Sequence, residues 1–135
     1  MKWLLVILSG IFLVGYSEAK EEDWKLFSES EGSSYYLDAE TVSFLSENVV
    51  RVWVKVVVSE KDRSAWVAKG GEKYLNLRYI KSPLEINCKE KMERSLSLEL
   101  FSDRDIVNSF KGMESQWNSI PPGSNWDNLH KAICK

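Results

Sequence analysis

The sequence predicts an α+β fold, an antiparallel sheet of about six strands with a C-terminal helix disulfide-tethered to one face. Three observations lead to this class. Apolar and polar residues alternate in the middle of the chain, which is the period of half-buried strands. The connections between these segments are too short for parallel crossovers, so neighbouring strands pair antiparallel. The segment after Pro121-Pro122-Gly123 carries apolar residues at helical spacing.

The centre of the predicted sheet is the valine-rich segment from Val50 to Val58. Its valines at even positions form one face, which we expect to be buried. The other face carries Arg51, Trp53 and Lys55 and meets water or a partner.

Two further segments repeat this alternation, Leu84 to Cys88 and Leu96 to Leu100, and the charged stretch from Lys89 to Arg94 connects them. Their apolar positions face the same way as the valines. One core under the C-terminal helix is therefore expected, lined by Val52, Val54, Val56, Ile86, Leu96, Leu98 and Leu100.

Shorter strands are expected on both sides of this centre, at Trp24 to Ser28, Tyr35 to Leu37 and Ile106 to Phe110. The residues between them, 29–33, 38–41 and 102–105, have the composition of turns and corners. The sequence does not decide the conformation of the segment from Ser59 to Tyr79. A helical turn, a long excursion between strands and a poorly ordered linker all fit its charged residues and its Gly70-Gly71 pair.

The C-terminal helix has a start signal at Ser124, a good N-cap, with Asp127 near the positive end of the helix dipole. Its apolar face carries Cys134, and Cys88 lies on the buried side of its strand. In an oxidising compartment such a pair most often forms a disulfide. The bridge would close a loop of about 45 residues and contribute about 4 kcal/mol.

A zinc site is the alternative interpretation of these cysteines. Cys88, His130 and Cys134 could supply three ligands, but a structural zinc site needs four and the sequence offers no obvious fourth. We therefore expect a disulfide, and neither a metal nor another cofactor.

Residues 1–19 have the organisation of a secretory signal peptide. Lys2 precedes an apolar run, and Ser17 and Ala19 are the small residues of a cleavage site. The run is shorter than the ~20 residues of a membrane-spanning helix. We expect export through the inner membrane, a mature single domain of residues 20–135 without a membrane span, and a periplasmic, cell-surface or secreted location.

The order of several short motifs resembles the surface-adhesin protein E-like family over nearly all of the expected mature chain. The motifs are Leu84 to Cys88, Asp103 to Val107, Trp117 to Ser124 and Leu129 to Cys134, preceded by Trp24 to Leu26, Tyr35 to Asp38 and Val50 to Lys55. The resemblance implies an antiparallel sheet with a disulfide-held C-terminal helix. It also implies an adhesin that binds host extracellular-matrix proteins, although the lipid-anchored adhesin that names the family differs from this chain, which has no cysteine near the expected cut.

The function expected from these features is binding, not catalysis. The chain of 135 residues has one histidine, and it has no Gly-x-Ser-x-Gly, phosphate-loop or dinucleotide motif. Its net charge of −2 argues against nucleic acid as a partner. Aromatic and positive residues suit a protein or glycan partner, and the candidate contacts are Arg51, Trp53, Lys55, Trp66 and Tyr74.

Two alternatives to this interpretation remain. Trp53 could pack under the segment from Ser59 to Tyr79, which would close the polar face of the sheet. The protein could also be a structural or inhibitory periplasmic envelope protein without adhesin activity.

Overall fold

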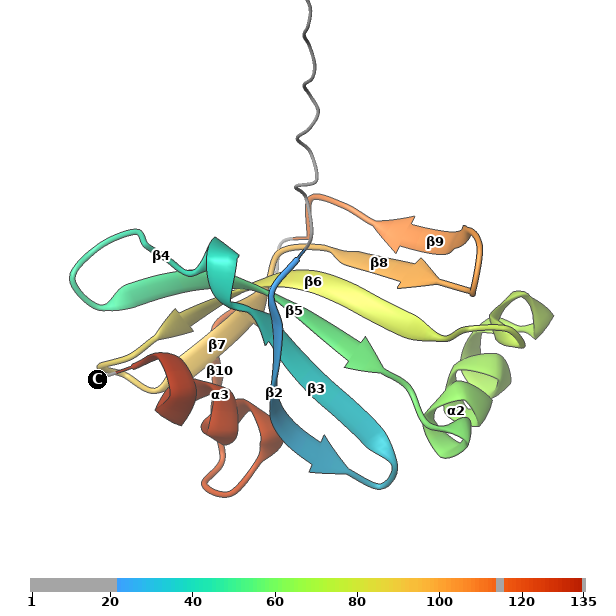
Figure 1. The fold of residues 1–135 in the computed structure, drawn as a ribbon, viewed down its shortest axis with the longest axis horizontal. Coiled ribbons are helices and arrows are strands. Elements are labelled where there is room, and N and C mark those ends of the chain that lie inside the picture. Colours follow the sequence, from blue (N-terminus) through green and yellow to red (C-terminus); the bar gives the residue numbers. More distant parts are fainter. Residues whose placement is uncertain (1–21, 114–115, 135) are drawn as a thin grey trace, which may run out of the picture.

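The computed structural model of the chain describes residues 22–113 and 116–134, so the predicted signal peptide lies outside the described residues. Within these ranges, nine strands form one antiparallel sheet. The helices α2 (Glu60–Gly70) and α3 (Asn125–Ile133) lie apart from each other, α3 beside the N-terminal strands and α2 beyond the end of the central ones (Figure 1). The predicted α+β class is confirmed.

The centre of the sheet is formed by β5 (Val49–Val57) and β6 (Tyr79–Asn87). The strand order is β10 (Asn118–Ser119), β7 (Met92–Ser95), β6, β5, β3 (Ser33–Asp38) and β2 (Trp24–Ser30). The two central strands pair along their whole length, so their alternate residues point to the same two faces. We call the face that carries Val50, Val52 and Val54 the inner face. The opposite face, with Arg51, Trp53 and Lys55, is the outer face.

The N-terminal hairpin consists of β2 (Trp24–Ser30) and β3 (Ser33–Asp38). Its turn is tighter than the expected residues 29–33, because Glu31 and Gly32 both adopt positive φ, 50° and 87°. Two such residues make the turn whose twist matches that of the flanking strands. A 3₁₀ turn, η1 (Ala39–Thr41), and the short strand β4 (Ser43–Phe44) then lead into β5.

The predicted single strand from Leu96 to Leu100 is wrong in its bounds. The chain forms β7 (Met92–Ser95) and β8 (Leu98–Phe101), and both strands pair with β6. The end of the stretch that was expected to be a charged connection therefore belongs to a strand. The break between β7 and β8 is stabilised by Ser82, whose hydroxyl donates to the Ser97 carbonyl at 2.6 Å.

Two more strands complete the sheet, β9 (Ile106–Phe110) and β10 (Asn118–Ser119). β9 pairs with β8 as the expected hairpin, whose loop is closed by a hydrogen bond from the Ser102 amide to the Asp105 carbonyl, 2.9 Å. The short strand β10 pairs with β7 at the edge of the sheet.

The segment from Ser59 to Tyr79 folds as α2 followed by η2 (Glu72–Tyr74), so the alternative of a poorly ordered linker is wrong. Ser59 caps α2, because its hydroxyl accepts a hydrogen bond from the Asp62 amide at 3.1 Å. Gly71 follows the last turn with φ of 99°, a conformation that favours glycine.

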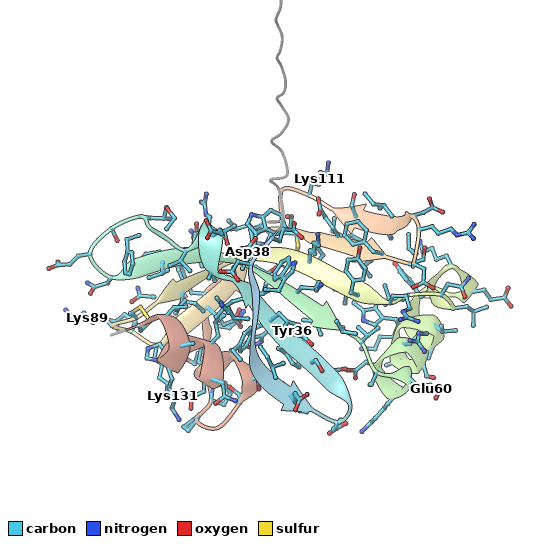
Figure 2. The ribbon with its side chains drawn as sticks, in the orientation of Figure 1. Tyr36, Asp38, Glu60, Lys89, Lys111 and Lys131 are labelled. Atoms are coloured by element: carbon cyan, nitrogen blue, oxygen red, sulfur yellow. A yellow bond between two sulfur atoms is a disulfide. The ribbon has the colours of Figure 1, made fainter. Side chains whose placement is uncertain are left out.

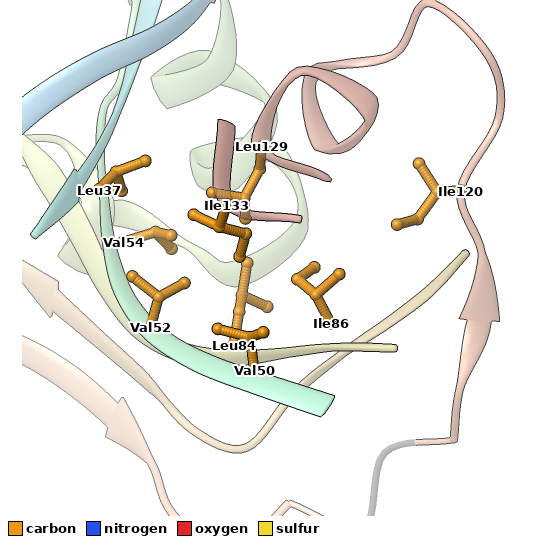
Figure 3. Close-up of a cluster of buried hydrophobic side chains, with 9 residues drawn as sticks. All are labelled: Leu37, Val50, Val52, Val54, Leu84, Ile86, Ile120, Leu129 and Ile133. Atoms are coloured by element: carbon orange, nitrogen blue, oxygen red, sulfur yellow. The ribbon is translucent and has the colours of Figure 1, made fainter. Parts of the chain in front are cut away.

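The C-terminal helix α3 begins as predicted. The Ser124 hydroxyl accepts from the Asp127 amide at 3.2 Å, and the Asp127 carboxylate accepts from the Gly123 amide at 2.8 Å. Leu129 and Ile133 point from α3 toward the side chains of the sheet (Figure 3). The disulfide is also confirmed, since Cys88 and Cys134 are bonded with their Cα atoms 5.6 Å apart.

The core differs from the expected single layer under α3. Val52, Val54 and Ile86 do pack with α3, in the cluster that Figure 3 shows. The other predicted members are placed differently: Val56, Leu98 and Leu100 pack in a second cluster with Tyr74 and Leu77, and Leu96 is half-buried at the break between β7 and β8.

The length of α3 explains this division. A helix of nine residues spans about 13 Å, whereas a nine-residue strand spans about 30 Å. One short helix therefore cannot cover the whole inner face. The segment around α2 and η2 covers the other end.

Candidate functional site

The five candidate contact residues lie on two different faces of the sheet. Arg51, Trp53 and Lys55 lie on the outer face. Trp66 and Tyr74 pack with the second cluster of the inner face. The structure therefore does not bring the five together into one surface, and each face is described separately.

Arg51 belongs to an ion-pair network of the outer face. Its Nη2 lies 2.7 Å from Oε2 of Glu85, and Nη2 of Arg94 lies 2.9 Å from Oε1 of the same carboxylate. The guanidinium of Arg94 lies 4.5 Å from the ring centroid of Trp117. Burial acts to raise the pKa of Glu85, but the hydrogen bonds from the two arginines outweigh it and hold the pKa below its ordinary value. The guanidinium of Arg51 is thus engaged with Glu85 within the protein.

Trp53 is half-buried on the outer face, directly across from Pro83 of β6. Its backbone amide donates to the Thr41 hydroxyl at 3.0 Å. Together with Trp24 and Lys81 it lines a shallow pocket of about 220 Å³. The alternative that it packs under the segment from Ser59 to Tyr79 is wrong, because α2 and η2 pack with the inner face.

Lys55 lies among aromatic rings contributed by three strands. Its Nζ is 5.1 Å from the ring centroid of Trp24 on β2, 5.7 Å from that of Tyr36 on β3 and 5.5 Å from that of Tyr79 on β6. These are cation–π distances. Burial lowers the pKa of Lys55, the nearby Lys81 lowers it further, and Glu22 acts in the opposite direction.

Lys81 extends this arrangement along the outer face. Its Nζ lies 5.6 Å from the ring centroid of Trp24 and 5.5 Å from that of Phe101, which stacks on Tyr79 with centroids 4.8 Å apart. It also forms an ion pair with Glu22 at 3.2 Å. We call the whole set the lysine–aromatic patch: Trp24, Tyr36, Lys55, Tyr79, Lys81 and Phe101.

Most of the lysine–aromatic patch was missed by reasoning from the sequence, which identified Lys55 alone. The register explains why: Lys55 lies opposite Lys81 on one side and opposite Tyr36 on the other. The available signal was the alternation of Tyr79, Ile80, Lys81 and Ser82. It continues the alternation of the predicted strand that begins at Leu84 toward the N-terminus.

The inner face carries a groove between the two helices, with a volume of about 560 Å³. Its floor is formed by apolar residues of the central strands. Trp66 of α2 and Trp126 of α3 belong to its lining. The floor residues are Val54, Val56, Ile80 and Leu84, and we call the whole cavity the inner-face groove.

Neither cysteine is available as a metal ligand, so the zinc alternative is wrong. His130, the one histidine of the chain, lies with its Nε2 3.0 Å from the Cys88 carbonyl oxygen, to which it can donate. In residues 22–113 and 116–134, no group of three or more His, Cys, Asp or Glu side chains is placed to hold a metal ion. None of the described helices has the length and apolar character needed to cross a membrane.

Comparisons with known proteins agree with this architecture. The family model described as surface-adhesin protein E matches residues 24–135. The crystal structure of protein E from non-typeable Haemophilus influenzae is similar with a TM-score of 0.53 at 14% identity, covering 96% of this chain and 82% of that one. A selenomethionine form of Haemophilus influenzae protein E has a TM-score of 0.50 at 15% identity, with 74% and 78% covered. No curated protein sequence matches the chain.

Proposed function

The chain belongs to the surface-adhesin protein E family, and from this premise we propose that it is an exported, non-catalytic binding module of the cell surface. Its partner is a protein or glycan that carries acidic groups. The contact surface is the lysine–aromatic patch of the outer face. Residues 1–19 are removed as a signal peptide during export through the inner membrane, which leaves the domain of residues 20–135.

The observation that carries this proposal is the position of two lysines among four aromatic rings. Lys55 and Lys81 are half-buried, as are the rings around them. The side chains are therefore ordered before a partner arrives, and binding costs less conformational entropy. Ammonium groups attract carboxylates or sulfates, and ring faces stack on sugars or on other aromatic residues.

Arg51, Trp53 and Tyr74 have other parts in this proposal. Arg51 holds the Glu85 carboxylate and Trp53 borders the patch through the shallow pocket. Tyr74 is a core residue that is 3% exposed. We therefore assign partner contact to Lys55 and Lys81, with Trp53 at the margin.

The test compares two double variants that have the same net charge. Lys55→Gln/Lys81→Gln removes both charges of the patch. The control, Lys69→Gln/Lys89→Gln, removes two charges from exposed positions, on α2 and in the turn before β7. Lys89 lies well away from Tyr36, a member of the patch (Figure 2). Binding is measured on immobilised extracellular-matrix proteins and on a glycan array, at low and at high salt.

We expect the patch variant to lose roughly tenfold or more in affinity for its partner, because it lacks the two ammonium groups that pair with the acidic groups of the partner. The control should stay within about twofold. Equal loss in both variants would mean that net charge alone attracts the partner and would contradict the placement. Binding to none of the proteins and glycans would favour the second candidate function, a structural or inhibitory envelope protein.

The export part of the proposal has its own test. Mass spectrometry of the protein from its native envelope should give a mature N-terminus at Lys20. A chain that retains Met1 in the envelope would contradict cleavage.

A further inference from the structure

The inner-face groove has carboxylates but no counter-charge among the described residues that line it. Asp62 of α2 and Glu93 of β7 line it, and none of the other described lining residues is Lys, Arg or His. Asp62 is engaged, since its carboxylate accepts a hydrogen bond from the Ser33 hydroxyl. Burial raises the pKa of Glu93, and a hydrogen bond with Asn118 offsets part of this effect. A bound cation at Glu93 would stabilise its ionised form.

The aromatic side chains of the groove are held in place by other rings. Trp126 meets Tyr35 edge to face, with centroids 5.7 Å apart and planes at 90°, and it also contacts Phe27 at 6.2 Å. Trp66 packs on Tyr74 with centroids 5.2 Å apart. Ring faces fixed in this way near a carboxylate are the chemistry that recognises organic cations in proteins.

The size of the groove selects the kind of ligand. Its volume of about 560 Å³ lies within the ~300–1,000 Å³ of small-molecule sites. Its floor is apolar, so the ligand needs an apolar body as well as its charge. Acidic ligands are disfavoured, because the described lining offers them carboxylates and no cation.

We propose that the inner-face groove binds a small organic cation with an apolar body, such as an arylalkylammonium, with its ammonium group at Glu93. The apolar body lies over the floor formed by β5 and β6, with Trp66 and Trp126 beside it. This site is on the face opposite the lysine–aromatic patch and has the opposite charge preference. It does not depend on the proposed adhesin function, which can fail without affecting it.

The first experiment uses three probes of nearly the same shape and different charge: phenylbutylammonium, phenylbutanol and phenylbutanoate. Each is titrated into the folded, oxidised protein at neutral pH and followed by amide NMR shifts. We expect the ammonium to bind at least roughly tenfold more tightly than the alcohol, and the carboxylate to bind least. The shifts should fall on β7, α2 and α3. Equal binding of ammonium and alcohol, or shifts confined to the outer face, would overturn the proposal.

The second experiment locates the charge. Glu93→Gln keeps the size of the side chain and can still hydrogen-bond with Asn118, so the fold should be retained. Glu99→Gln on β8 is the matched control, because this residue lines the shallow pocket of the outer face. We expect Glu93→Gln to remove the preference for the ammonium over the alcohol and to leave alcohol binding unchanged. A preference that survives in Glu93→Gln, or is lost in Glu99→Gln, would overturn the assignment to Glu93.

Discussion

Loss of the disulfide should remove a large part of the stability of this domain. Cys88 and Cys134 are separated by 46 positions in the sequence. The chain entropy of a loop of this size corresponds to about 4 kcal/mol of stabilisation. Both cysteines also pack against the main hydrophobic cluster, so their replacement by alanine loses some apolar contact as well. We expect Cys88→Ala/Cys134→Ala to lower the free energy of unfolding by about 4 to 5 kcal/mol, out of the ~5–15 kcal/mol of a typical domain.

The assay is equilibrium unfolding in urea followed by tryptophan fluorescence, with amide hydrogen exchange on the same samples. The double variant leaves no free thiol that could react. Leu129→Ala, which acts by opening a cavity under α3, is the comparison, with an expected loss of about 3 to 5 kcal/mol and the disulfide intact. In the double variant α3 should exchange faster than β5, because only non-covalent contacts, namely apolar packing, a few side-chain hydrogen bonds and the Lys91–Asp127 ion pair, then hold α3 to the sheet. A loss below about 1 kcal/mol would mean that loop closure by the disulfide contributes little to the stability of the domain.

Three further substitutions test other parts of the structure. Leu100→Ala should lower the free energy of unfolding in urea by about 3 to 4 kcal/mol, and Leu98→Ala should lower it by roughly half of that. The reason is that Leu100 is 0% exposed, whereas Leu98 is half-buried at the groove. Equal losses would contradict the packing described for the second cluster. Asp127→Asn should be destabilising at neutral pH, because a hydrogen bond from the Gly123 amide and the ion pair with Lys91 hold the pKa of Asp127 below its ordinary value. A carboxylate whose pKa is lowered by folding contributes its full stability above its unfolded-state pKa and loses it as the pH falls through its folded-state pKa. The difference in melting temperature between wild type and variant should therefore be constant near neutral pH and should begin to shrink below about pH 4. Glu85→Gln should lower the melting temperature by leaving two arginines without their charged partner, and an unchanged melting temperature would contradict a structural role for the network.

The elements that sequence reasoning found carry a complete local signal. β5 has four alternating valines from Val50 to Val56, and α3 has a capping serine followed by apolar residues at helical spacing. The disulfide followed from the same patterns, since they placed both cysteines on buried faces. Such elements are determined by short-range periodicity and capping, which one sequence displays.

The elements that were missed depend on contacts between distant segments. β6 begins at Tyr79, well before the predicted strand, and Pro83 in its middle obscured the continuation. Proline is tolerated there because Pro83 lies between the part of β6 that pairs with β8 and the part that pairs with β7. For α2 an available signal was the N-cap Ser59 with Asp62 three residues later. The apolar face that would have completed this signal is weak, because the two half-buried apolar residues of α2, Trp66 and Val67, lie among charged ones.

The lysine–aromatic patch could likewise be predicted from the sequence only in part. Lys55 was recognised because it lies on the polar face of a clear strand. Its neighbours in the patch come from β2, β3, β6 and β8, and only the strand register brings them together. The inner-face groove exists because α2 and α3 cover separate ends of one face, a property of helix lengths and positions that no local motif encodes.

The most direct test of the proposed function is the hydrogen-exchange footprint of the chain bound to the partner found in the binding screen. We expect protection of the outer-face strand segments around Tyr36, Lys55 and Lys81, with α2 and α3 exchanging as in the free protein. Protection confined to α2, α3 or the inner-face groove, with the lysine–aromatic patch unaffected, would contradict it.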